Sequence, residues 1–192
     1  MQPNDDKVIL YNKLIESCKN NDREAQYRLY NLLSGKMFAV CLRYAKHREA
    51  AEDLLQEGFV KVFTHIDKFR GEGSFEGWVR RIIVNTAVEH YRRSTKMYPM
   101  VNVEDVNRDI PWVDTGENLE LEDLMNMINK LSQGYKTIFN LYVVEGYSHK
   151  EIAEMLEISE GTSKSQLARA RYLLMEMVKK SEIVKKSAPF AK

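Results

Sequence analysis

One stretch of the sequence repeats its apolar residues at the spacing of an α-helix, and this pattern limits the fold more than any other feature. Spacings of three, four and seven residues place the large side chains on a single stripe. The stripe consists of Ala51, Leu54, Leu55, Phe59, Val62, Phe63 and Ile66. The opposite face carries Glu49, Glu52, Asp53, Gln56 and Glu57. The pattern predicts an amphipathic helix with a polar outer face.

Similar helical stripes recur on both sides of this segment. Residues 25–44 show one with Ala25, Leu29, Leu32, Leu33, Met37, Val40, Cys41 and Tyr44. Residues 75–86 show another with Phe75, Trp78, Val79, Ile82, Ile83 and Thr86, and Leu121, Leu124, Met125, Ile128 and Leu131 form a third. No segment alternates polar and apolar residues as a half-buried strand would. The fold class expected is therefore all-α.

An acidic stretch without helical periodicity divides the chain. Residues 1–98 carry 17 basic and 13 acidic side chains, residues 99–120 carry 1 and 6, and residues 121–192 carry 11 and 9. The middle stretch also holds two of the four prolines, which is typical of a linker. We therefore expect two small helical domains, residues 8–95 and 119–180, an extended acidic linker at 96–118 and a flexible tail at 181–192.

Composition excludes several classes of protein. With 192 residues and 44% hydrophobic side chains, the chain can build a core, so global disorder is excluded. No apolar run reaches the roughly 18 to 20 residues of a membrane span, and the polar segment Met1–Lys7 does not resemble a signal peptide. Cys18 and Cys41 show no spacing typical of a disulfide framework or a zinc site. We expect a soluble cytoplasmic protein. Its net charge of +1 by itself argues against a nucleic-acid binder.

A glycine-containing loop and a basic helix follow the acidic-faced helix. The loop runs from Phe69 to Phe75, and its glycines permit backbone conformations that other residues resist. Ser74 is a candidate cap for the next helix. The polar side of that helix carries Arg80, Arg81, Asn85, Glu89, Arg92 and Arg93. Phe75 and Trp78 have the phase of its inner face, so we expect them to pack in the core rather than stack on a ligand.

The C-terminal part contains the pattern of a helix-turn-helix. Ser148 and Glu151 form a capping box before a short helix at 152–156, and a second helix starts at Glu160 after a tight turn. The expected core is Ile152, Ala153, Leu156, Ile158, Leu167 and Ala170. Lys164, Ser165, Gln166, Ala168 and Arg169 face outward, while Gly161 and Thr162 at the helix start suit a phosphate. A plain helical hairpin is the alternative.

No motif for catalysis or metal binding emerges. The segment Gly71–Gly73 lacks the Lys-Ser/Thr helix of a phosphate loop, and the four histidines have no metal-ligand spacing with a carboxylate pair. No nucleophile stands beside a base. We therefore expect no cofactor, no metal and no enzymatic activity.

Two separate motifs resemble bacterial sigma factors. The stretch from Ala51 to Phe63, followed by Phe69–Trp78 and Ile82–Asn85, is similar to sigma region 2. The stretch from Glu145 to Ala153, followed by Ile158–Arg171, is similar to sigma region 4. The two regions in this order, with only a linker between them, resemble the extracytoplasmic-function (ECF) sigma factors. The resemblance covers roughly residues 10–95 and 119–180.

The resemblance implies partners and residue roles. Core RNA polymerase would be bound through its β′ clamp and β flap, with Asp53, Gln56 and Glu57 docking on a basic coiled coil of the clamp. Melted minus-ten promoter DNA would contact Arg70, Gly71, Glu72, Gly73, Ser74, Arg80, Arg81, Asn85, Arg92 and Arg93. Minus-thirty-five duplex DNA would contact Gly161, Thr162, Lys164, Ser165, Gln166, Ala168, Arg169 and Arg171. Gln166 departs from the arginine frequent in relatives and favours adenine readout if it reaches a base.

Further expectations complete this hypothesis. The acidic linker would run near the RNA path, and an anti-sigma protein is expected to regulate the two exposed domains. A subunit that relies on polymerase for DNA affinity needs little excess positive charge, which fits the net charge of +1. The alternatives are an autonomous helix-turn-helix regulator with a helical sensing or dimerisation domain, and a helical metalloenzyme.

Overall fold

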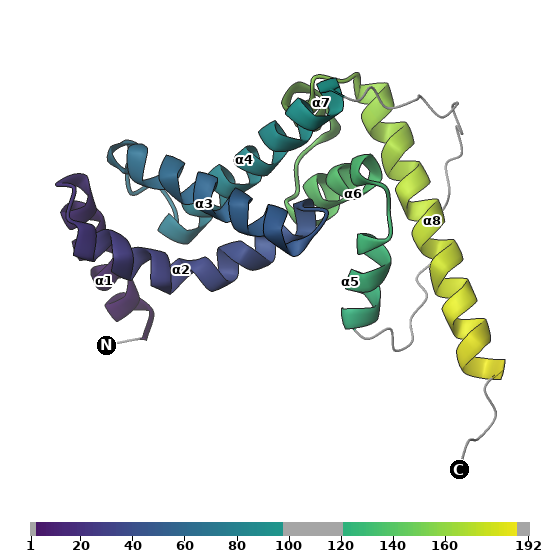
Figure 1. Ribbon diagram of the computed structural model, residues 1–192, viewed down its shortest axis with the longest axis horizontal. Helices are drawn as coiled ribbons and strands as arrows, with labels where there is room; N and C mark the ends of the chain where they lie inside the picture. Colours follow the sequence, from purple (N-terminus) through teal and green to yellow (C-terminus); the bar gives the residue numbers. More distant parts are fainter. Residues whose placement is uncertain (1–2, 98–120, 188–192) are drawn as a thin grey trace, which may run out of the picture. The chain divides into compact units, whose positions relative to one another are not determined.

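The computed structural model describes the backbone of residues 3–97 and 121–187 (Figure 1). Both ranges are helical and contain no strand, which confirms the all-α prediction. The chain divides into two compact units, residues 1–98 and 99–192. Most of the acidic linker expected at 96–118 lies outside the described residues, although its first residues belong to the helix that ends at Met97.

The first unit is built from four α-helices. They are α1 (Pro3–Lys19), α2 (Arg23–Tyr44), α3 (Arg48–Thr64) and α4 (Phe75–Met97), with a 3₁₀ turn η1 (Ile66–Lys68) after α3. α2, α3 and α4 pack against one another in pairs, and α1 packs on α2. Side-chain caps fix three helix starts: Asp22 Oδ1 accepts the Glu24 amide at 2.9 Å, His47 Nδ1 accepts the Ala50 amide at 3.2 Å, and Ser74 Oγ accepts the Gly77 amide at 3.0 Å. The predicted cap at Ser74 is therefore confirmed.

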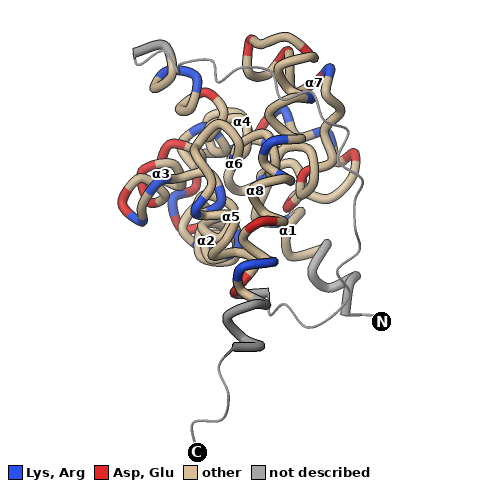
Figure 2. The backbone as a smooth tube through the Cα atoms, turned by 90° about the vertical axis from the view of Figure 1, so that its right-hand side faces the viewer, with Lys and Arg blue, Asp and Glu red and all other residues tan. Residues whose placement is uncertain are grey.

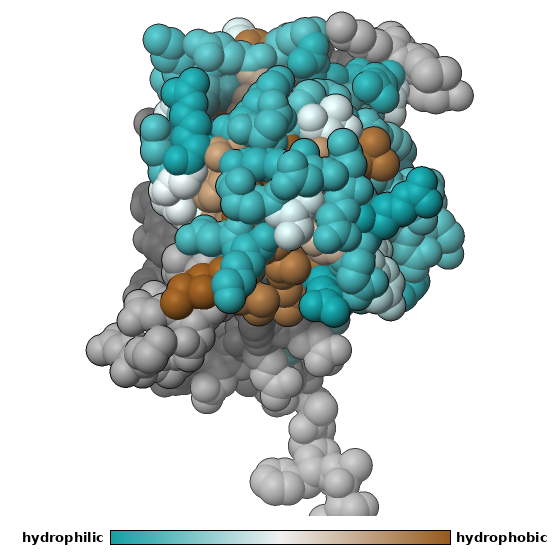
Figure 3. All heavy atoms as spheres, turned by 90° about the vertical axis from the view of Figure 1, so that its left-hand side faces the viewer, coloured by the Kyte–Doolittle hydropathy of each residue, from teal (hydrophilic) through white to brown (hydrophobic). Residues whose placement is uncertain are grey.

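The core of this unit follows most of the predicted stripes. Ala51, Leu54, Leu55, Phe59, Val62 and Ile66 are buried, and Phe63 is half-buried. The prediction is wrong at Leu32, which is 47% exposed although its spacing fits the α2 stripe. Leu33 beside it is fully buried, so the stripe that packs is narrower than the sequence pattern. The face of the molecule in Figure 3 is largely hydrophilic, and its apolar areas are small.

Two helical glycines in this unit have opposite surroundings. A Cβ atom at Gly58 of α3 would clash with Cδ1 of Ile83, a fully buried residue of α4. A side chain at position 58 would therefore require the buried Ile83 side chain to move. A Cβ atom at Gly35 of α2 would have no neighbour within 4 Å. The packing of α3 on α4 therefore favours glycine at position 58. No packing contact favours glycine at position 35.

The second unit consists of α5 (Leu121–Asn129), α6 (Gln133–Phe139), a π-helical turn η2 (Asn140–Val144), α7 (His149–Leu156) and α8 (Glu160–Ser187). α8 packs against α5, α6 and α7. Five of the expected core residues, Ile152, Ala153, Leu156, Leu167 and Ala170, are buried, and Ile158 is half-buried. Residues 181–187, expected in a flexible tail, continue α8. The expected domain end at residue 180 stays a prediction.

The contrast between the two glycines predicts opposite effects of one substitution. Gly58→Leu overpacks the α3–α4 contact and should lower the free energy of unfolding by at least about 2 kcal/mol. Gly35→Leu enters open space and should raise the free energy of unfolding by about 0.5 kcal/mol, because leucine favours a helix more than glycine does. Urea unfolding followed by circular dichroism measures both. Equal destabilisation by the two variants would contradict this account of the helix contact.

Candidate protein and nucleic-acid interfaces

The outer face of α3 carries the residues expected to bind polymerase. Asp53 and Gln56 are exposed, and Glu57 is half-buried. Arg48 and Lys61 flank the acidic residues Glu49, Glu52, Asp53 and Glu57 of this helix, on which Figure 2 shows both red and blue segments. The sequence predicts that this face is exposed, because its residues lie opposite the apolar stripe that packs on α2 and α4. Asp53 and Gln56 are therefore available to a partner.

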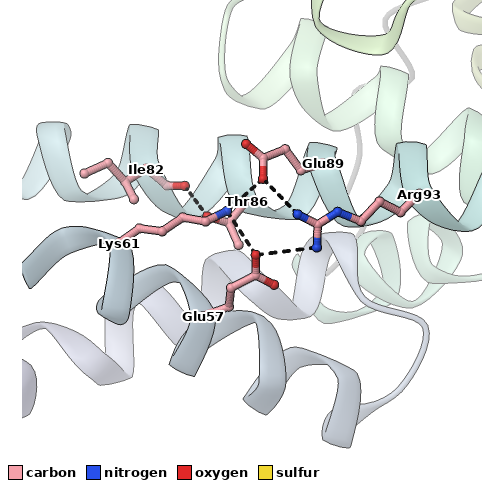
Figure 4. Close-up of polar contacts among 6 residues, drawn as sticks. All are labelled: Glu57, Lys61, Ile82, Thr86, Glu89 and Arg93. Carbon is pink, nitrogen blue, oxygen red and sulfur yellow. Dashed lines mark hydrogen bonds and ion pairs between the residues drawn. The ribbon is translucent and has the colours of Figure 1, made fainter. Parts of the chain in front are cut away.

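Glu57 belongs to a network of charged side chains that joins α3 to α4 (Figure 4). Lys61 Nζ lies 3.0 Å from Glu57 Oε1 and donates to Glu89 Oε2 at 2.8 Å. Arg93 lies 3.7 Å from Glu89 and 4.0 Å from Glu57. Two residues expected to bind different partners, Glu57 and Arg93, thus contact each other. Burial lowers the pKa of Lys61, but the hydrogen bonds to Glu89 and Glu57 outweigh it, so its pKa is raised overall.

An open cleft of about 720 Å³ lies beside the loop between α3 and α4. Gly71 and Gly73 have φ angles of 78° and 82°, the left-handed region that glycine adopts most readily, so the loop can turn sharply at the cleft edge. Ser74 and Arg80 also line the cleft. Of the expected minus-ten residues, these four come together at one hollow.

The cleft contains residues that the sequence did not single out. Tyr11 of α1 and Lys36 and Arg43 of α2 line it. Lys36 forms an ion pair with Glu76 at 2.7 Å, and the Lys36 and Glu76 side chains are 58% and 29% exposed. These residues stand far from the loop in the sequence and show no local motif. Only the packing of α1 and α2 against the start of α4 brings them to the cleft.

The remaining expected minus-ten residues lie elsewhere. Arg70 and Glu72 are exposed in the loop and do not line the cleft. Arg81, Asn85 and Arg92 recur at helical spacing on another face of α4, where the first two are exposed and Arg92 is half-buried. Arg93, which belongs to the α3–α4 network, continues the row of Arg81 and Asn85 at spacings of four residues. The ten expected residues thus divide among the cleft, the exposed loop and this face of α4, and their roles stay predictions.

An aromatic cluster supports the loop. Phe69 lies 5.1 Å from Phe75 and 5.6 Å from Trp78, and Phe75 stacks on Trp78 at 5.6 Å, all between ring centroids. Phe75 is 5% exposed, so its expected place in the core is confirmed, whereas Trp78 is only half-buried. These rings hold the two ends of the loop together.

The helix-turn-helix of α7 and α8 has the expected caps. Ser148 Oγ accepts the Glu151 amide at 3.3 Å, and Glu151 Oε2 accepts the Ser148 amide at 2.8 Å, which confirms the capping box. Ser159 Oγ accepts the Thr162 amide at 2.9 Å at the start of α8. A phosphate bound at this helix start would therefore have to displace the Ser159 hydroxyl.

The expected minus-thirty-five residues divide between the outer face and the flanks of α8. Lys164 is exposed, 3.8 Å from Glu160, and Gly161 is exposed too. Ser165, Ala168 and Arg169 share the outward side, with the Arg169 guanidinium over the Tyr172 ring at 5.3 Å. Gln166 and Arg171 stand on the two flanks nearer the core. Gln166 Oε1 is buried and has no hydrogen-bond partner among the described residues.

His149 connects the two helices of this motif. Its ring stacks on Tyr142 of η2 at 4.5 Å between centroids, and its Nδ1 lies 2.9 Å from Oγ of the fully buried Ser163. The Arg171 guanidinium lies over the same tyrosine at 5.6 Å. Burial lowers the pKa of His149, the positive charges of Lys164 and Arg171 lower it further, and Glu160 opposes them. The neutral ring is thus the form that this packing favours.

Comparison with known proteins settles the family. The model of sigma-70 region 2 matches residues 29–97, and that of sigma-70 region 4 matches residues 121–174. The ECF RNA polymerase sigma-E factor of Haemophilus influenzae is 32% identical over 173 residues, which cover 84% of this chain and 91% of that protein. This chain belongs to the ECF family of RNA polymerase sigma factors.

Two other similar proteins also match this sigma factor over most of its length. The ECF sigma factor SigW of Bacillus subtilis is 26% identical over 187 residues, covering 89% of this chain and 98% of that protein. The sigma factor RpoE of Bartonella quintana, solved in complex with the anti-sigma factor NepR, is 24% identical and covers 80% of this chain and 96% of that one, with a TM-score of 0.49. The family resemblance seen in the sequence is confirmed, while the roles of individual residues stay predictions.

Three further findings concern the described residues alone. No helix among them is long and apolar enough to cross a membrane. Within residues 3–97 and 121–187, no group of three or more His, Cys, Asp or Glu side chains could hold a metal ion. Cys18 and Cys41 are buried free thiols.

Removal of Lys61 tests the network in this sigma factor. Lys61→Met leaves Glu57 and Glu89 near each other without their ammonium, and should lower the free energy of unfolding by about 1 kcal/mol at low salt and by less at high salt. Because the pKa of Lys61 is raised, its contribution is complete at neutral pH and is lost only as pH rises through that pKa. Urea unfolding at neutral pH measures the effect. The exposed Lys68→Met is the matched control; an equal loss in both variants would refute the network.

The lowered pKa of His149 predicts a dependence on pH. The histidine should titrate below its ordinary value of 6.5, because burial and the nearby cations disfavour the charged ring. The stability it contributes is therefore present above pH 6.5 and is lost as pH falls below that value. NMR titration of the imidazole protons measures the pKa directly. Arg171→Gln should raise it and Arg169→Gln should not; titration of wild-type His149 at or above 6.5 would contradict the prediction.

Proposed function

We propose that this sigma factor directs promoter-specific transcription initiation with its three described surfaces in separate roles. The α3 face of Asp53 and Gln56 docks on core RNA polymerase. The cleft beside the Gly71–Gly73 loop holds a base of the melted minus-ten element. The outer face of α8 reads the minus-thirty-five duplex. The cleft is the observation that carries this proposal, since the comparisons establish the family and say nothing of the residues used.

The cleft has the features that binding of an unpaired base requires. A flipped base needs a hollow next to backbone that can approach it closely, and its phosphates need cations nearby. The cleft supplies about 720 Å³, the glycine backbone of the loop at its edge, and the positive side chains Lys36, Arg43 and Arg80. Glu76 offsets part of this charge through its ion pair with Lys36. We therefore extend the expected minus-ten set to include Lys36 and Arg43.

The α8 face supports duplex binding by a different chemistry. An exposed lysine and an arginine on the outward side can contact phosphates or guanine edges in the major groove, and Ala168 offers a methyl group to thymine. Gln166 needs a change of rotamer before its buried amide oxygen can meet a base. We thus rank Lys164, Ser165 and Arg169 above Gln166 and Arg171 as DNA contacts.

We infer further that the protein acts in the cytoplasm, where its polymerase partner works, and carries no catalytic site of its own. An anti-sigma protein that covers the α3 face would compete directly with polymerase for Asp53 and Gln56. The acidic linker near the RNA path stays a prediction, because residues 98–120 lie outside the described part of the chain.

Transcription with purified components tests the function. Run-off transcription with core polymerase on a promoter library should yield defined start sites that depend on this protein. Absence of both core binding and initiation would refute the proposed function.

Charge reversal at one position tests the docking surface separately. Asp53→Lys should lower affinity for core polymerase at least about tenfold, a loss of roughly 1.4 kcal/mol, because it places a cation against a basic partner. Asp53 is a cleaner target than Glu57, whose carboxylate also stabilises the α3–α4 network. The exposed Asp67→Lys in η1 is the matched control. Equal core affinity of the two variants would refute the docking assignment and leave the family unaffected.

A further inference from the structure

His149 is the one histidine of residues 99–192, and it lies where the two helices of the helix-turn-helix meet. The other histidines of the chain all belong to residues 1–98: His47, His65 and His90. Histidine is the side chain whose ordinary pKa lies between about pH 5 and 8. If the second unit takes up a proton near neutral pH, we therefore expect His149 to receive it.

Two contacts place the His149 ring beside cations of α8. The ring and the Arg171 guanidinium both lie against the Tyr142 ring, at 4.5 Å and 5.6 Å from its centroid. Nδ1 of His149 lies 2.9 Å from Oγ of Ser163, which directly precedes Lys164 in α8. The His149 side chain is half-buried, so it is both held by its neighbours and open to solvent on one side.

The charges around this ring are unbalanced. α7 packs mainly against α8 and η2, and η2 carries no charged residue. On α7 itself Lys150 and Glu151 follow the histidine, and the Glu151 carboxylate is held in the capping box. α8 contributes three charged groups: Glu160, Lys164 and Arg171. The two cations of α8 disfavour a positive charge on the ring, and its single carboxylate opposes them only in part.

Duplex DNA would reverse this balance. Lys164 is exposed on the face of α8 assigned to the duplex, and Arg171 stands on the flank of the same helix. A phosphate that pairs with either cation offsets a positive charge near the His149 ring and adds a negative charge. An anion at this distance favours the protonated imidazole. The cations that keep the ring neutral in the free protein are thus the groups that DNA would occupy.

The contacts of the ring can also hold its protonated form. The Ser163 hydroxyl can donate to a neutral Nδ1 or accept from a protonated Nδ1, so this hydrogen bond survives the gain of a proton. A positive imidazole stacked on the Tyr142 ring is attracted by the negative face of that ring. Protonation in the complex therefore does not require α7 and α8 to separate.

We propose that His149 takes up a proton from the solvent when duplex DNA binds the α8 face, so that affinity for the duplex rises as pH falls below neutrality. The proposal rests on the proposed function of α8 and adds His149 of α7 to the residues that determine duplex affinity. The only bond that forms is the second N–H bond of the imidazole. Promoter binding by this sigma factor would then strengthen when its surroundings become more acidic.

Duplex binding as a function of pH tests this proposal. The probe is a mixed-sequence DNA duplex of about 20 base pairs, which is longer than the helical turn that a helix-turn-helix covers. Its affinity for the full-length protein is measured by fluorescence anisotropy at low salt. Affinity should rise about three- to fivefold from about pH 7.5 to about pH 6, because a pKa raised by one unit on binding gives about tenfold over the whole titration. His149→Gln should remove most of this rise, whereas His65→Gln, the matched change at an exposed histidine of the first unit, should keep it.

NMR of the wild-type protein gives a second readout that needs no folded variant. The imidazole protons of His149 should titrate at higher pH with the duplex than without it, and an unchanged titration would overturn the proposal. Duplex binding with equal affinity at both pH values, weaker binding at the lower pH, or the same rise in His149→Gln would overturn it too, and each leaves the α8 assignment intact. Absence of duplex binding at any pH would overturn both this proposal and the proposed role of α8.

Discussion

The close contact of α3 with α4 is the constraint on which the first unit depends. Gly58 lets the two helices approach so closely that Ile83 fills the place of a side chain. This contact fixes the rotation of α3 about its own axis. Once that rotation is fixed, the acidic residues must face outward, because they lie opposite the apolar stripe. The exposed acidic face of α3 thus depends on how the opposite side of the same helix packs.

The same contact creates the network of Glu57, Lys61, Glu89 and Arg93. Residues at i and i+4 on α3 and on α4 meet across the narrow gap between the helices, so one ammonium and one guanidinium serve two carboxylates. Each ion pair is partly exposed and contributes little alone. Together the pairs set the positions of side chains expected to face two different macromolecules. A substitution of Glu57 would therefore alter both the outer face of α3 and the contacts between α3 and α4.

Local signals in the sequence predicted local structure well. The capping box at Ser148, the cap at Ser74 and the apolar stripe of α3 depend on neighbours within a few residues, and all are present in the structure. α8 continues beyond Lys180 because nothing in the sequence after this residue stops a helix until Pro189. The predicted burial of Leu32 was wrong because helical periodicity alone does not reveal how wide a strip of the α2 surface the neighbouring helices cover.

Contacts between distant segments could not be predicted in this way. Tyr11, Lys36 and Arg43 reach the cleft only through the packing of three helices, and no spacing in the sequence relates them to the loop at 71–73. The pairing of Lys61 with Glu57 follows from i, i+4 spacing and could have been found, whereas that of Lys61 with Glu89 could not. The difference between Gly35 and Gly58 could not be predicted either, because it depends on which atoms surround each glycine in the folded chain.

The internal ion pairs also explain how a near-neutral chain can present surfaces for DNA. Arg93 and Lys36 each have a carboxylate partner, Glu89 and Glu76, so part of their positive charge is already offset. Phosphates must compete with these carboxylates, which weakens sequence-independent attraction to DNA. Sequence-specific binding is weakened less. A base in the cleft, or a base edge against α8, would add interactions that the carboxylates do not oppose. A net charge of +1 then fits a chain in which carboxylates offset part of the positive charge of the side chains that we propose contact DNA.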